Sequence, residues 1–162
     1  MIIRDAIDSD LDAILAIHND AILSSVAIWT DEPVERSERE EWLAEHRRLG
    51  HPVLVAEVQG AVVGYASYGP WRSRCGYRDT VENSVYIAEG HRGSGIGRQL
   101  MTELITRART AGMHIMIADI EAGNAASLHL HETLGFQLEG IVHEVGQKFG
   151  RRLDLAILRL AL

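Results

Sequence analysis

The chain has 162 residues, 46% of them hydrophobic, and a formal net charge of −7. A chain of this length buries one sizeable core, and because no break in composition divides it we expect a single domain over residues 1–162. The acidic balance disfavours nucleic acid as a partner, since phosphate binding needs a basic surface. No window has the roughly 18 apolar residues of a membrane span, and acidic residues interrupt the N-terminus before it reaches signal-peptide length. We therefore expect a cytoplasmic protein without a membrane partner, and the single cysteine fits a reducing compartment.

Residues 1–6 predict a short strand, and Ser9 with Asp12 resembles a capping box that begins a helix over residues 9–23. The apolar positions expected to face the core are Leu11, Ile14, Leu15 and Ile22. A second helix is expected over residues 34–49, because its apolar side chains share one face and its charged ones lie elsewhere.

Two apolar runs then meet at Gln59-Gly60, which is typical of a hairpin turn, and Pro70 ends the second run. The next strand is expected within residues 80–89. It is followed by a helix over residues 95–111, whose one apolar face holds Ile96, Leu100, Leu104, Ile105 and Ala108, with Gly112 as its stop.

Residues 114–120 predict a buried strand, residues 124–135 a short helix that ends at Gly135, and residues 136–162 two strands joined near Phe149-Gly150. The order of elements indicates a mixed α/β fold in which helices cover a central sheet.

Residues 84–100, SVYIAEGHRGSGIGRQL, place four glycines between an apolar strand and a helix. Such a loop offers backbone N–H groups and the positive end of the helix to an anion, and the missing Cβ atoms let a pyrophosphate come close. The alternative is an ordinary tight turn. A Walker loop is excluded because Ile96 and Gly97 follow Gly95 where Lys-Ser or Lys-Thr would stand, and the spacing of the glycines is not that of a dinucleotide fingerprint.

The pattern Arg92-x-x-Gly95-x-Gly97 resembles the pyrophosphate motif of the GNAT superfamily of acetyl-CoA-dependent N-acetyltransferases, and residues 124–136 resemble its second CoA motif. The resemblance implies a mixed central sheet of about six to seven strands flanked by about four helices. Acetyl-CoA would be the acetyl donor, with no metal. The positions that match its binding site are Val85, Tyr86, Ile87, Arg92, Gly93, Ser94, Gly95, Ile96, Gly97, Arg98, Asn124, Ser127 and His131.

Three further segments, residues 27–33, 69–87 and 131–136, resemble the phosphinothricin and methionine sulfoximine acetyltransferases, which acetylate the α-amino group of small amino-acid analogues. The similarity spans nearly the whole chain and implies a homodimer that acts on a small-molecule amino acid. Trp29 replaces the phenylalanine expected of phosphinothricin-specific relatives, which favours methionine sulfoximine or methionine sulfone as the substrate.

Acetyl transfer needs a neutral amine, whereas an α-amino group of pKa about 8 is mostly protonated at neutral pH. Glu82 matches the family's general base, although an ordinary glutamate is too weak a base by about 3 to 4 pH units unless burial or a water relay helps. The alternative for Glu82 is a solvated carboxylate at the end of a strand.

His131 occupies the place where the wider superfamily has a tyrosine that serves the departing thiolate, and backbone N–H groups near residues 85–87 are expected to meet the thioester carbonyl. His129 and His131 do not form a convincing metal pair, because residues two apart on a helix point to different sides.

The substrate loop carries Arg72, Arg74 and Arg78, a local positive cluster suited to a carboxylate, of which we select Arg74. The positions that match the family's substrate site are Trp29, Trp71, Arg72, Arg74, Tyr77, Thr80 and Glu82. Each of these arginines has the alternative of being merely solvated, and the aromatic residues that of belonging to the core.

Cys75 lies between arginines and offers a rival mechanism with a covalent acyl-enzyme, but no partner histidine is near it in the sequence, so we expect direct transfer in a ternary complex. Two other functions stay open: acetylation of another amine, on a protein N-terminus or an aminoglycoside, and a non-catalytic acetyl-CoA sensor.

Overall fold

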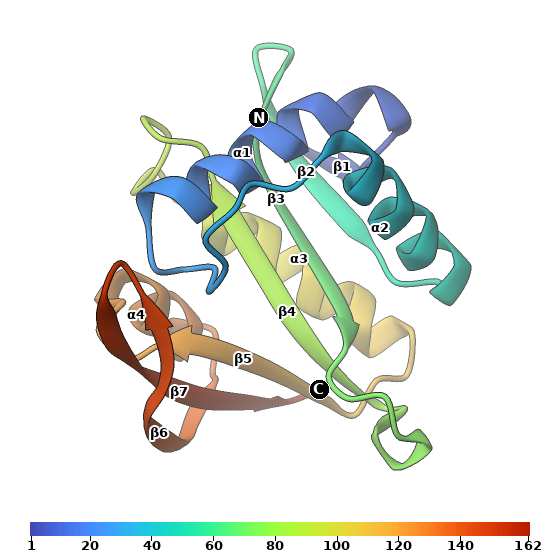
Figure 1. Cartoon of the computed structure of the whole chain (residues 1–162). Helices are drawn as coiled ribbons and strands as arrows, with labels where there is room; N and C mark the ends of the chain where they lie inside the picture. Colours follow the sequence, from blue (N-terminus) through green and yellow to red (C-terminus); the bar gives the residue numbers. More distant parts are fainter.

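The computed structural model describes all of residues 1–162. Seven strands form one sheet, and four α-helices pack against its two faces (Figure 1). The strands are β1 (Ile2–Asp5), β2 (Val53–Val58), β3 (Ala61–Pro70), β4 (Thr80–Ile87), β5 (Ile115–Glu121), β6 (Gln137–Lys148) and β7 (Arg151–Ala161). The α-helices are α1 (Leu11–Ser24), α2 (Arg36–Leu49), α3 (Ile96–Thr110) and α4 (Ala125–Thr133). None of the helices combines the length and hydropathy that a membrane span requires.

The strands are ordered β1-β2-β3-β4-β5-β7-β6 across the sheet. All neighbours are antiparallel except β4 and β5, which are parallel and are connected through α3. Helices α1 and α2 cover the front face in Figure 1, and α3 covers the back. The predicted mixed sheet with covering helices is therefore confirmed.

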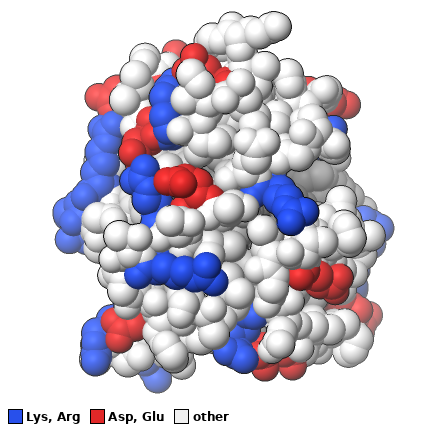
Figure 2. Space-filling model, turned by 180° about the vertical axis from the view of Figure 1, so that it is seen from behind, with Lys and Arg blue, Asp and Glu red and all other residues white.

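Two apolar clusters lie on the two faces of the sheet. The larger contains 19 buried residues and joins α3 to the sheet, with Leu128 and Leu130 of α4 packed against it. The smaller contains eight buried residues and joins α1 and α2 to the other face. The outer side of α3 presents charges of both signs to solvent (Figure 2), among them the ion pair between Arg107 and Glu103.

The start of the first helix differs from the prediction. A 3-10 turn (Asp8–Asp10) precedes α1, and Ser9 makes no capping bond. The side-chain bonds at the start of this turn come from Asp10 instead: its carboxylate accepts the N–H of Ile7 at 2.9 Å and two bonds from Arg4. Arg4 holds the pKa of Asp10 below its usual value, so the charged carboxylate is the form that stabilises this end of the helix.

The other predicted elements match the structure within two or three residues at their ends. The apolar face predicted for α3 is buried completely and also includes Met101. In α1, Leu15 is only partly buried, whereas Ile17 and Ala21 are buried in the core. The predicted turn at Phe149-Gly150 joins β6 to β7.

Candidate functional site

The sheet divides between β4 and β5. Strand β4 pairs with β3 from Val81 to Ile87, but it pairs with β5 only from Thr80 to Glu82. Beyond Glu82 the two strands diverge (Figure 1), so the edge of β4 that faces β5 has no backbone partner. At the point of divergence the side-chain amide of Asn83 donates to the carbonyl of Ile117 at 2.9 Å. This fork opens the sheet beside two cavities.

The larger cavity has a volume of about 820 Å³ and lies between the fork and the glycine loop. Three exposed cations line it: Arg92, Arg98 and Arg151. Arg92 is held over the end of β4 because its Nε donates to the carbonyl of Ile87 at 3.2 Å, and its Nη2 lies 3.4 Å from Asp20. The N-terminus of α3 adds a positive helix end to this side of the cavity.

The glycines of the loop have two different physical roles. Gly93 and Gly95 have φ of +75° and +82°, a conformation that other residues adopt with strain, and a Cβ on either would meet nothing within 4 Å. Gly97 has helical backbone, but a Cβ there would lie 3.4 Å from Leu130 of α4. Backbone conformation therefore favours glycine at positions 93 and 95, whereas a side chain at position 97 would make an ordinary contact with α4.

The remaining predicted cofactor positions differ in which cavity they line, and His131 lines the smaller one only. Val85 and Tyr86 line both cavities, as do Asn124 and Ser127 at the N-terminus of α4, where the Asn124 side chain accepts the N–H of Ser127 at 3.2 Å. Ile87 lines the larger cavity only. Ser94 and Ile96 line neither: the Ser94 hydroxyl donates to a carbonyl within the loop, and Ile96 is buried in the core.

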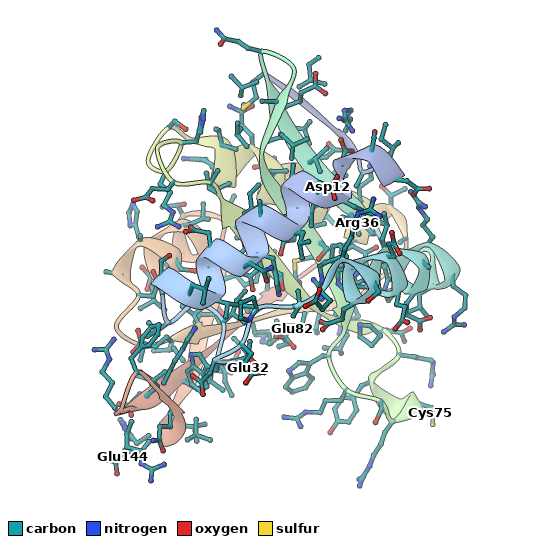
Figure 3. The ribbon with its side chains drawn as sticks, turned by 45° about the horizontal axis from the view of Figure 1, so that its top comes forward. Asp12, Glu32, Arg36, Cys75, Glu82 and Glu144 are labelled. Carbon is teal, nitrogen blue, oxygen red and sulfur yellow. The ribbon has the colours of Figure 1, made fainter.

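A smaller cavity of about 310 Å³ continues from the first, with which it shares Val85, Tyr86 and the N-terminus of α4. Three acidic residues, Glu82, Asp119 and Glu121, line it together with Trp29 and His131. Figure 3 shows Glu82 near the middle of the molecule, below the segment that joins α1 to α2. A molecule in the larger cavity thus has access through the fork to a second, acidic chamber.

Glu82 is not a solvated carboxylate. Burial raises its pKa to about 7, the negative charge of Asp119 adds to this, and the positive charge of Arg72 opposes it. Burial also raises the pKa of Asp119, and the positive charge of Arg72 again opposes the rise. A carboxylate with a pKa near 7 is a base suited to neutral pH. The sequence predicts that Glu82 needs burial or a water relay to act as a base, and the structure shows the burial.

Asn83 follows Glu82 in β4, and its side chain points to the opposite face of the strand because successive side chains of a strand alternate. There the ring of His131, 2% exposed, lies with Nε2 3.0 Å from Oδ1 of Asn83 and Nδ1 2.8 Å from the carbonyl of Ser127. Both contacts are to acceptors, so a ring that donates to both carries two protons. Burial lowers the pKa of His131, and the bond to the carbonyl of Ser127 opposes this change. The lowered pKa makes the protonated ring a stronger acid.

The predicted substrate residues are only partly brought together. Trp29 lines the smaller cavity, and Arg72 is close enough for its charge to lower the pKa values of Glu82 and Asp119. The ring of Trp71 lies under the guanidinium of Arg72 at 4.5 Å and edge-on to Tyr77 at 5.4 Å.

No residue of the β3–β4 loop lines the chamber directly. Trp71 and the exposed Arg72 line neither cavity, nor do the exposed Arg74, Tyr77 and Arg78, and Thr80 begins β4 outside both. Cys75 lies at the far tip of the loop, away from Glu82 (Figure 3).

Sequence reasoning missed several polar residues that line the cavities, among them Asn83, Asp119, Glu121 and Arg151. Asp119 is the one charged residue within the otherwise apolar stretch from Ile115 to Ile120, which is a recognisable signal. Asn83 gives no such signal, because its importance comes from its place at the fork. No group of three or more histidine, cysteine or acidic side chains is placed to hold a metal ion.

Residues 14–136 match the model of the acetyltransferase (GNAT) family, and the chain belongs to this family. It is 52% identical over 161 residues to the L-methionine sulfoximine/L-methionine sulfone acetyltransferase of Pseudomonas aeruginosa, with 99% of this chain and 94% of the relative covered. It is 38% identical over 161 residues to the phosphinothricin N-acetyltransferase of Alcaligenes faecalis, with 99% and 82% covered.

Two solved structures share the fold closely. An acetyltransferase from Salmonella typhimurium, solved with acetyl-CoA, has a TM-score of 0.99 and 49% identity and covers 100% of this chain and 94% of its own. A structure described as ribosomal-protein-alanine N-acetyltransferase from Brucella melitensis has a TM-score of 0.99 and 52% identity, with both chains covered completely. The family resemblance drawn from the sequence motifs is therefore confirmed.

The glycine loop generates the first prediction. Gly95→Val places a branched side chain at φ +82° and should distort the loop, raising the dissociation constant of acetyl-CoA at least tenfold, or about 1.4 kcal/mol. Gly60→Val is the matched control, because Gly60 has φ +81° in the β2–β3 turn, also with open space around it. Isothermal titration calorimetry measures both; equal affinity in the two folded variants would exclude the loop from the site.

The second prediction follows from the raised pKa of Glu82. The native state holds this proton more tightly than the unfolded state, so Glu82 destabilises the native state increasingly as the pH rises from about 4.5 to about 7. We expect Glu82→Gln to have a higher free energy of unfolding than the wild type at pH 8 and an equal one at pH 4, measured by urea denaturation. Glu41→Gln, at an exposed site on α2, is the control. Parallel pH dependence for wild type and Glu82→Gln would show a solvated carboxylate.

Proposed function

We propose that the protein is an acetyl-CoA-dependent N-acetyltransferase for the α-amino group of a small amino-acid analogue, namely methionine sulfone, methionine sulfoximine or phosphinothricin, and that it works by direct transfer in a ternary complex. The observation that carries the proposal is the fork at Glu82, which joins a cavity lined by cations to a chamber that contains a carboxylate of pKa about 7.

The larger cavity fits acetyl-CoA, which supplies the acetyl group as a thioester. Arg92, Arg98 and the N-terminus of α3 would hold its anionic end, and the unpaired edge of β4 would offer backbone N–H groups from Val85 to Ile87 toward the pantetheine arm and the carbonyl. The fit rests on the positive φ of the loop glycines and on the backbone groups that the fork leaves free.

The two faces of β4 would divide the proton transfers. Glu82 accepts a proton from the substrate ammonium in the acidic chamber, which leaves the neutral amine that acetyl transfer requires. On the other side of the strand, His131 would donate a proton to the departing thiolate from one ring nitrogen, which gives up its bond to Asn83 or Ser127, while the other bond holds the ring in place. Cys75 has no part in this scheme, because it is exposed at a loop tip that lines neither cavity.

Recognition of the amino acid would combine opposite charges. Arg72 carries the positive charge that acts on Glu82 and Asp119, and it is our candidate partner for the substrate carboxylate ahead of the more distant Arg74. Trp29 would cover the substrate side chain. The name of the Brucella relative favours a second candidate function, acetylation of the N-terminal residue of a protein; a substrate of that kind has no free carboxylate beside its amine.

We also propose that residues 1–162 form one domain, that the protein is cytoplasmic and that it is a homodimer. Support for the dimer comes from β6, which exposes Leu138, Ile141, Val142 and Val145 to solvent. Sedimentation of a monomer at micromolar concentration would refute the dimer, and recovery of the native protein in a membrane or secreted fraction would refute the location.

A substrate panel tests the function. Release of CoA thiol is expected with methionine sulfone and not with an alanine-starting peptide or an aminoglycoside; turnover of the peptide alone would support the second candidate, and no turnover with retained acetyl-CoA binding would indicate a sensor. Arg72→Ala should lower kcat/KM for methionine sulfone by about 2 to 3 kcal/mol, the scale of a hydrogen bond to a charged group.

The methyl ester of methionine sulfone is the companion substrate, because it lacks the anionic carboxylate. The ester should be poor with the wild type and little further impaired by Arg72→Ala. The same measurements on Arg74→Ala test the alternative arginine, and Arg78→Ala is the control. Equal loss for acid and ester in Arg72→Ala would remove Arg72 as the carboxylate partner.

A further inference from the structure

The segment between α1 and α2 forms one wall of both cavities without being a helix or strand itself. Ser25, Val26 and Ala27 line the larger cavity, and Ala27, Ile28 and Trp29 line the smaller. Within the segment the indole N–H of Trp29 donates to the carbonyl of Val26 at 2.9 Å. Such a wall defines a pocket only if something outside the segment fixes it.

Lys148, the last residue of β6, provides that fixation. Its side chain is 1% exposed, and its ammonium group donates to the carbonyls of Ile22 at 2.5 Å, Ser25 at 2.8 Å and Ile28 at 2.6 Å. All three donors are used on backbone acceptors at the end of α1 and in the segment. Burial lowers the pKa of the ammonium, and the negative charge of Asp31 opposes this change. The charged form is the one that can donate three bonds.

Gly146, two residues earlier on β6, contacts the ring of Trp29. A Cβ on Gly146 would lie 2.2 Å from both Cε3 and Cζ3 of that ring, far inside van der Waals contact. The φ of Gly146 is not positive, so space rather than backbone conformation requires the glycine. Strand β6 shifts register between Val142 and Gly146. After this shift, Lys148 and Gly146 both contact the segment from β6.

We propose that Gly146 and Lys148 are positioning residues that set the depth of the amine-substrate chamber. Gly146 lets the Trp29 ring pack directly on the backbone of β6, and Lys148 ties the segment that carries the ring. A side chain at Gly146 would push the ring away from β6 and alter the chamber that the other side of the ring lines. The inference rests on the proposed function for its effect on substrates, but not for the contact itself.

A double-mutant cycle in urea denaturation tests the contact independently of any activity. Gly146→Ala should lower the denaturation midpoint in the wild-type background, and at least half of that loss should disappear in the Trp29→Leu background, where the clashing ring is absent. Gly140→Ala is the matched control, because Gly140 lies on the same strand and a Cβ there meets nothing within 4 Å. Additive effects of Gly146→Ala and Trp29→Leu would overturn the proposal.

Steady-state kinetics tests the consequence. In Gly146→Ala the KM for methionine sulfone should rise at least tenfold while the KM for acetyl-CoA stays within twofold, because Trp29 lines only the smaller cavity. In Lys148→Met both KM values should rise, because the tied segment lines both cavities; Arg152→Met, at an exposed neighbouring site, is its control. A parallel rise of both KM values in Gly146→Ala, or none, would overturn the proposal. If the wild type does not acetylate methionine sulfone at all, the proposed function fails and the stability cycle alone decides the positioning role.

Discussion

The short pairing of β4 with β5 is the constraint on which the rest of the site depends. Three residues of β4 pair with β5 and the next five do not, so one strand serves both as part of the sheet and as the edge of a cleft. Alternation along β4 then points Glu82 and Asn83, which contacts His131, to opposite faces of the strand, and all three residues line the smaller cavity at the fork. Acid and base can thus act on one molecule in the fork without contacting each other.

This arrangement has an energetic cost that the fold has to absorb. Burial of Glu82 beside Asp119 disfavours its charged form, and the pKa near 7 measures that penalty. Arg72 relieves part of it without an ion-pair contact, and a closer cation would return the pKa toward its ordinary value and weaken the base. The distant placement of Arg72 is therefore compatible with both a carboxylate-binding role and a basic Glu82.

Much of the architecture could be predicted because local signals were strong. The apolar face of α3, the glycine stop after it and the turn at Phe149-Gly150 follow from residue type and spacing alone. The start of α1 could not be predicted in the same way: Ser9 has the better local sequence signal, but Asp10 is paired with Arg4 of β1. A contact between separate elements prevailed over a local motif.

In the site, too, some features could be predicted from local sequence and others could not. The motifs identified the glycine loop and Glu82, but no sequence pattern shows that β4 and β5 separate after Glu82, that Asn83 bridges to Ile117, or that Lys148 crosses from β6 to the end of α1. These features depend on strand order and register. From the sequence we select Arg74 among the three arginines of the substrate loop, whereas Arg72 is the one whose charge acts on Glu82 and Asp119.

The central claim is that Glu82 is the base, and the pH dependence of kcat/KM for methionine sulfone tests it most directly. In the wild type, kcat/KM should rise with pH as Glu82 loses its proton near pH 7, in addition to the titration of the substrate amine. Glu82→Gln should lack the limb near pH 7, retain that of the amine, and turn over about two orders of magnitude more slowly or worse, with unchanged affinity for acetyl-CoA. Near-normal turnover of Glu82→Gln across the pH range would contradict the account.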